Sequence, residues 1–167
     1  MNPKILQLRL WIAQLMLKVL QLQQLQLQKN MDKRQTLFDT AVTCLGKDMA
    51  PMEDEYGCAE AVNQVFKKAF GVEVGGYLST YRMYQALSDT SRFLKVFVPM
   101  AGDIIISPTG YGNGRIRSGH VGIVGENGQV MSNTSDNGLW LVNYNLDSWY
   151  QRYLKLGGFP IHYYRVL

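Results

Sequence analysis

The composition of this 167-residue chain changes near residue 34, and this change limits what the chain can fold into. Residues 4–28 consist mainly of Leu, Gln and basic residues, and no acidic residue precedes Asp32. A segment of such low complexity is set apart from a folded core. The rest of the chain has a length that suits one globular domain. We therefore predict a basic, Leu/Gln-rich helical head over residues 1–34 and one domain over residues 35–167.

The head has the pattern of an amphipathic helix. Its polar residues recur at spacings of three, four and seven and so share one side: Lys4, Gln7, Gln14, Lys18 and Gln21. Apolar residues fill a wide arc opposite them. After Leu20 the order shifts toward alternation of Leu and Gln, which no longer favours a helix.

Two kinds of partner are open for this helix. It can pack on its own domain or on a second copy as a coiled coil, or residues 4–28 can lie on an anionic membrane surface. Arg9, Lys18 and the repeated Gln interrupt the apolar run, so it does not fit a transmembrane span. Because no small-residue cleavage site follows, it is not a convincing signal peptide either.

Charge and cysteine content exclude several functional classes. Residues 1–34 hold six basic and one acidic residue, whereas residues 35–167 hold eleven and twelve, so the domain is nearly neutral and nucleic acid is not expected as a partner. The two cysteines and two histidines lack the paired spacing of a structural zinc site, so no metal is predicted. A Cys44–Cys58 disulfide stays open on count alone, although two cysteines do not form the dense framework of a small secreted protein.

The order of the predicted elements indicates an α+β domain. Helical spacing predicts a helix over residues 32–45 and another from about Cys58 to Phe70, with Gly46 and Gly71 as stop signals. The mixed aromatic pattern of residues 77–98 suggests a further helical segment. Short β-like runs follow, and a helix precedes the last one: strands over 103–107, 120–125, 129–133 and 160–167, and a helix over 146–158. Helices followed by antiparallel strands are typical of this class.

Cys58 is the candidate nucleophile of this domain. It stands at the start of a predicted helix, where free N–H groups and the helix dipole stabilise a thiolate and an oxyanion. Cys44 falls among apolar helix positions, so we expect a buried thiol with no catalytic role. A thiol needs a base, and His120 is the better candidate because it opens a strand beside a glycine-rich loop, while His162 lies in the closing strand.

The motifs around these residues resemble those of papain-like cell-wall hydrolases. Y-G-C-A-E-A-V at a helix start is followed by A-G-D-I-I-I-S and S-G-H-V-G-I-V, and this order over about residues 35–167 is similar to the CHAP and NlpC-type cysteine peptidase and amidase families. The resemblance implies a papain-like α+β fold in which the N-terminal helices pack on a small antiparallel sheet. It also implies that Cys58 is the nucleophile, that His120 is the general base, and that no cofactor is needed.

The resemblance further implies a third residue that orients the imidazole from the next strand. We favour Asn133, because an amide oxygen can accept the imidazole N–H, and keep Ser132 and Asp136 as alternatives. Tyr56, Gly57 and Gly119 are candidates for oxyanion stabilisation or substrate contact. NlpC-type enzymes carry Asp and Ser on either side of the nucleophile, whereas here Cys58 lies between two small residues, Gly57 and Ala59. The scissile bond therefore stays open.

These observations lead to one main hypothesis and two alternatives. The main one is a peptidoglycan hydrolase that cleaves a muramoyl amide or a peptide bond of the stem or crossbridge through a Cys-His(-Asn) acyl-enzyme. The alternatives are a non-catalytic envelope-binding or assembly protein that retains the fold, and a cysteine hydrolase of another amide. The first hypothesis suits a phage-type lysin that acts at the bacterial cell wall and stays in the cytoplasm before release or on a virion.

Overall fold

The computed structural model describes residues 3–52, 57–134 and 138–167. The chain forms two compact units, residues 1–32 and residues 33–167. One continuous helix, α1 (Pro3–Thr43), supplies the described part of the first unit and also enters the second. The expected weakening of the helix after Leu20 is therefore wrong, whereas the helix predicted over 32–45 is present to Thr43 as the continuation of the same helix. Leu, Gln and Lys are all good helix formers, and no Gly or Pro interrupts residues 4–45, so nothing in the Leu-Gln alternation ends the helix.

The hydropathy of helix α1 bears on the expectation that residues 4–28 do not span a membrane. It contains an 18-residue window with a mean hydropathy of 1.3 that is long and apolar enough to cross a membrane by length and composition. The core helix of a soluble protein or a signal sequence near the N-terminus passes the same test. Arg9 and Lys18 therefore do not by themselves exclude a membrane-spanning segment in α1.

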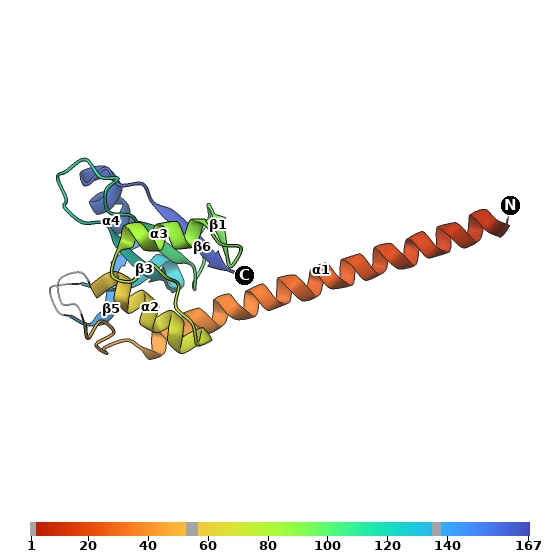
Figure 1. Cartoon of the computed structure of the whole chain (residues 1–167), viewed down its shortest axis with the longest axis horizontal. Coiled ribbons are helices and arrows are strands. Elements are labelled where there is room, and N and C mark those ends of the chain that lie inside the picture. The colour runs from red at the N-terminus through yellow and green to blue at the C-terminus, as the bar shows by residue number, and fades with distance from the viewer. Residues whose placement is uncertain (1–2, 53–56, 135–137) are drawn as a thin grey trace. The chain divides into compact units, whose positions relative to one another are not determined.

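The second unit is built on a six-stranded sheet in the order β1-β6-β2-β3-β4-β5, in which all paired strands are antiparallel. Figure 1 labels strands β1, β3, β5 and β6 and helices α2, α3 and α4 of this unit. The strands are β1 (Phe93–Val96), β2 (Ile104–Ser107), β3 (His120–Val124), β4 (Gln129–Asn133), β5 (Trp140–Asn145) and β6 (His162–Val166). The remaining elements are α2 (Gly57–Phe70), α3 (Thr80–Ser88), the short turn η1 (Glu126–Gly128), α4 (Leu146–Trp149) and the π-helical η2 (Tyr150–Leu156). The predicted α+β class and the four predicted strands are confirmed.

Two parts of the sheet were not anticipated. Residues 77–98 hold the short helix α3 and then strand β1, because β1 gains its hydrogen bonds from β6, which is more than sixty residues away in the sequence. Strand β5 pairs with the whole of β4 through a register shift at Val130 and Met131. Both strands depend on partners that local periodicity does not reveal.

The two faces of the sheet have different covers. The face that we call the helix face packs against α2 and the end of α1, and its strands contribute Ile104, Ile106, Val121, Ile123 and Met131. The opposite face, called the aromatic face, packs against α4 and η2 and contains Ile105, Val124, Val130, Trp149, Tyr153 and Phe159. Successive residues of a strand point to opposite faces, so this division assigns every strand side chain to one of them.

Helix α2 has the boundaries that its sequence predicts. It ends at Phe70 and is followed by Gly71, whose φ of 75° is left-handed and whose N–H donates to the Lys67 carbonyl at 2.8 Å. Glycine adopts this conformation without a steric penalty, which explains the stop at this position. Lys67 and Lys68 in the last turn complement the negative end of the helix dipole.

Candidate functional site

Cys58 is the second residue of α2, and close packing fixes this helix start. A Cβ atom on Gly57 would lie 2.6 Å from the Ala50 Cβ and 2.9 Å from the side-chain amide group of Asn133. No side chain fits there, so the glycine lets the helix approach the end of β4. Cys58 is thereby held against the sheet at the point where the strands β3 and β4 separate.

The Cys58 thiol lies next to the backbone of β3. The β3–β4 pairing joins Ile123 to Met131 and Val124 to Val130 at the turn end, and the backbone N–H of Val121 hydrogen-bonds the thiol instead. Cys58 is only 8% exposed. Burial raises the pKa of the thiol from 9.0 to about 11, and the hydrogen bond from Val121 opposes this shift without cancelling it. The thiol is therefore protonated at neutral pH in this structure.

His120, the first residue of β3, lies on the aromatic face. Its ring centroid is 5.3 Å from that of Trp149, 5.6 Å from Tyr144 and 5.7 Å from Tyr153, with which it stacks. Burial among these rings, together with the positive charge of Arg152, lowers the pKa of His120 from 6.5 to about 3. A neutral imidazole is the form that can accept a proton from a thiol.

The structure thus brings Cys58 and His120 to the same strand start from opposite sides. The thiol contacts the amide of Val121, the residue that follows His120, while the imidazole packs against the aromatic rings. Among the described residues, no hydrogen bond joins the two side chains. Catalytic hydrogen bonds are often long without a substrate and form in the complex, so this geometry is compatible with a thiol–imidazole pair at rest.

Sheet alternation separates the two leading candidates for the third site residue. Asn133 pairs with Trp140 and lies on the helix face beside Gly57, and its amide, in the orientation that satisfies its neighbours, donates to the carbonyls of Gly138 and Leu139 at 3.1 Å each. Ser132 points to the aromatic face, as His120 does. In the described part of the chain, the Ser132 Oγ and the His120 Nε2 are both buried without a hydrogen-bond partner.

The other predicted site residues have different positions. The N–H of Gly119 donates to the Thr109 Oγ1 at 2.9 Å, and the Thr109 Oγ1 lies 2.8 Å from the Thr80 Oγ1. A Cβ atom on Gly119 would lie 2.0 Å from the Ser107 carbonyl oxygen. Gly119 therefore joins two loops, and its N–H is engaged within the protein. Tyr56 and Asp136 lie outside the described residues.

Sequence reasoning missed the aromatic residues that enclose His120. The Trp149 indole N–H donates to the Ser107 Oγ at 3.1 Å, and Ser107 is the direct cross-strand partner of His120 in β2. The hydroxyl oxygens of Tyr144 and Tyr153 lie 3.3 Å apart. The sequence signal for them was the spacing of the aromatic residues between Tyr144 and Tyr153. Helix α4 and η2 bring Trp149 and Tyr153 of this segment against the imidazole.

Asp103 of the G-D-I-I-I motif has a structural position. Its carboxylate is fully buried and accepts two hydrogen bonds from Arg165, at 2.9 Å from Nε and 2.7 Å from Nη2, and one at 2.7 Å from the N–H of Met100. These contacts tie the start of β2 to β6. The motif residue therefore holds the sheet together and does not face Cys58.

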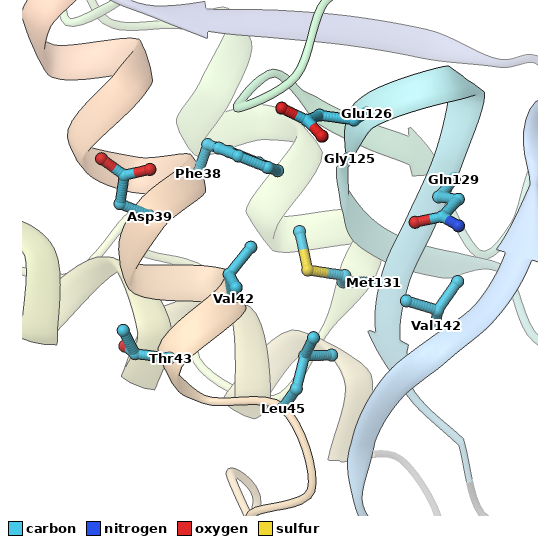
Figure 2. Close-up of a pocket in the computed structure, with 10 residues that line it drawn as sticks. All are labelled: Phe38, Asp39, Val42, Thr43, Leu45, Gly125, Glu126, Gln129, Met131 and Val142. Atoms are coloured by element: carbon cyan, nitrogen blue, oxygen red, sulfur yellow. The ribbon is translucent and has the colours of Figure 1, made fainter.

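A separate pocket of about 530 Å³ lies between the end of α1 and the β3–β4 turn (Figure 2). Phe38, Val42, Met131 and other apolar side chains line it, and the carboxylates of Asp39 and Glu126 are also at its wall. Neither Cys58 nor His120 lines this pocket. Within residues 3–52, 57–134 and 138–167, no group of three His, Cys, Asp or Glu side chains could hold a metal ion.

The second cysteine, Cys44, has a different environment from that of Cys58. Cys44 is 1% exposed in the core of the helix face, and both cysteines are free. The structure therefore contains no Cys44–Cys58 disulfide.

Comparisons with known proteins give a fold but no sequence family. No protein-family model matches the chain, and no curated protein matches it either. Among solved structures, the chain is similar to one in the crystal structure of the type VI native effector–immunity complex Tae3–Tai3 from Ralstonia pickettii, with a TM-score of 0.51 and 17% sequence identity. The match covers 79% of this chain and 97% of that chain. This likeness confirms the predicted papain-like α+β fold class, and at this identity it shows the fold alone.

Proposed function

We propose that this protein is a cysteine hydrolase that cleaves an amide bond of bacterial peptidoglycan, with Cys58 as nucleophile and His120 as base. The observation that carries the proposal is the position of the thiol: at the start of α2, it is hydrogen-bonded by the backbone amide of Val121, the residue that follows His120. The motifs that resemble cell-wall hydrolases support the substrate class, and the fold shared with a chain of a type VI effector–immunity complex is compatible with it.

The proposed reaction begins with a neutral Cys58 thiol and a neutral His120 imidazole. The Cys58 Sγ attacks the amide carbonyl carbon while its proton passes to the imidazole of His120. The oxyanion that forms is stabilised by the backbone N–H of Cys58 at the free end of α2. His120 then protonates the leaving amine as the C–N bond breaks. Water, deprotonated by the same imidazole, releases the acyl group from the thioester and restores the thiol.

The position of Ser132 makes it the candidate for orienting His120. Its hydroxyl shares the aromatic face and the lack of a partner with the imidazole, and a bridge between them would satisfy two buried polar atoms. Asn133, predicted for this role, lies on the helix face. We propose that Asn133 instead holds residues 138–139 against the start of α2.

The proposal is tested on purified peptidoglycan sacculi of several crosslink types. The wild-type protein should release soluble fragments whose new termini name the bond, whereas Cys58→Ala should release none and keep its fold, since Cys58 lies at the edge of the core. Cys44→Ala is the matched control and should stay active, because its thiol lies in the core away from β3. Equal release by wild type and Cys58→Ala would overturn the proposal.

A second function, a non-catalytic binding protein that retains the fold, is favoured by one observation. The imidazole of His120 is enclosed by three rings and forms no hydrogen bond with the thiol among the described residues. A binding protein would pull down with intact sacculi without releasing fragments from any wall type. The same incubation, followed by sedimentation of the sacculi, distinguishes the two functions.

A further inference from the structure

The first unit of the chain presents a large apolar surface. Fifteen large apolar side chains between Ile5 and Met31 are each 43–66% exposed, and the buried residues of α1, Leu37 and Ala41, both lie in the second unit. Soluble proteins rarely expose so many apolar side chains together unless a partner covers them. The question is which partner fits this helix.

A second copy of the chain accounts for part of this surface. The β-branched residues recur every seven positions, and each is followed by Leu three positions later: Ile5, Leu8, Ile12, Leu15, Val19 and Leu22. This is the seam of a parallel two-stranded coiled coil. Such a coil covers these six side chains and leaves the other nine in water, including Leu10 and Leu17 on the opposite side of the helix. It also sets Lys4 of one helix beside Arg9 of the other.

A lipid surface accounts both for the extent of the exposed apolar surface and for the charge of the helix. It can cover apolar side chains around a wide arc of the helix, and residues 3–31 carry four basic residues and no acidic one, which complements anionic headgroups. The 18-residue window with a mean hydropathy of 1.3 lies in the same helix. Long Lys and Arg side chains can embed their stems while the charges stay at the headgroups. We propose that residues 3–31 bind an anionic lipid bilayer and attach the hydrolase domain to it.

The test is flotation of the full chain with vesicles of phosphatidylcholine, with or without phosphatidylglycerol. The wild type should float with the anionic vesicles, and a variant in which Lys4, Arg9 and Lys18 are all changed to Gln should bind them about a hundredfold more weakly. A control with the body lysines Lys68, Lys95 and Lys155 changed to Gln should bind as the wild type does. No binding to anionic vesicles at low salt, or equal losses from both triple variants, would overturn the proposal.

A matched pair of leucines separates lipid from a second copy. Leu15 lies on the seam and Leu17 on the opposite side, and both are about half exposed. If lipid covers the helix, Leu15→Gln and Leu17→Gln should each weaken vesicle binding several-fold and to a similar extent. If a second copy covers it, only Leu15→Gln should lower the molar mass measured by analytical ultracentrifugation without vesicles, and that result would contradict the lipid proposal.

Discussion

The two faces of the sheet are built from the same strands but bury different kinds of side chain. The helix face is lined mainly by apolar side chains from β2, β3 and β4 under α2, with Asn133 as a buried polar residue at its edge. The aromatic face holds the buried polar groups Ser107, His120 and Ser132 of the same strands, and the rings of Tyr144, Trp149 and Tyr153 surround His120. Hydrophobic burial suffices to hold α2, whereas polar side chains need partners with hydrogen-bonding edges or faces.

This difference suggests a division of labour. The helix face supplies stability and fixes the position of the Cys58 thiol, and the aromatic face holds His120, the proposed base, and the groups that set its pKa. We expect substitutions around His120 on the aromatic face to change rate and pH dependence, and substitutions on the helix face other than at Cys58 to change mainly stability.

The largest expected effect is that of His120→Ala. Loss of a general base typically lowers the rate by about 10²–10⁴-fold, and we expect this loss in fragment release from sacculi with little change in the circular dichroism spectrum. His162→Ala is the matched control, because His162, the first residue of β6, stacks on Tyr84 of α3. If the His162 variant loses activity and the His120 variant does not, the assignment of the base is wrong.

Asp103→Asn should give the largest loss of stability among polar substitutions. The change removes the charge that pairs with Arg165, and breaking a buried ion pair typically costs about 3–5 kcal/mol, which partial exposure of Arg165 reduces to about 2–4 kcal/mol. Urea unfolding measures this free energy. A cost below about 0.5 kcal/mol would show that the pair does not hold β2 to β6.

The pH dependence of stability isolates His120. Its pKa is lowered to about 3 in the folded protein, so between pH 6.5 and about 3 the unfolded chain binds the proton and the folded one does not. Stability contributed by the neutral imidazole is therefore present above pH 6.5 and decreases as pH falls, by up to about 1.4 kcal/mol per pH unit. Because carboxylates such as Asp103 contribute to both proteins, unfolding across this range should show a steeper decrease in the wild type than in His120→Gln; parallel curves would contradict the buried neutral imidazole.

Substitutions of Ser132 and Asn133 compare the two faces of the sheet directly, because these neighbouring residues have their side chains on opposite faces. Ser132→Ala should lower kcat about tenfold and shift the acid limb of the pH–rate profile, since a hydrogen bond to a charged imidazole is lost. Asn133→Ala should cost about 1–3 kcal/mol of unfolding free energy, since two carbonyls lose their donor, with kcat nearly unchanged. The reverse result, a rate loss in the Asn133 variant alone, would restore Asn133 as the orienting residue.

Local signals in the sequence determined much of this protein. The Leu/Gln-rich head, the helix that begins near Cys58 and ends before Gly71, and the strands of D-I-I-I-S and H-V-G-I-V follow from composition, from glycine as a stop and from apolar runs that indicate buried strands by themselves. Cys58 at a helix start and His120 at a strand start were therefore visible before the fold was known. Their chemistry depends on residue type and on these local positions.

Tertiary structure decided what depends on partners far apart in the sequence. Strand β1 exists because β6 lies beside it, and the aromatic rings reach His120 because α4 and η2 pack on one face of the sheet. The period of two along β4 puts Ser132 and Asn133 on opposite faces, and only the placement of α2 shows which face belongs to the thiol. The sequence names the candidate reactive groups, and long-range pairing and burial set their protonation states, because desolvation is a property of the assembled fold.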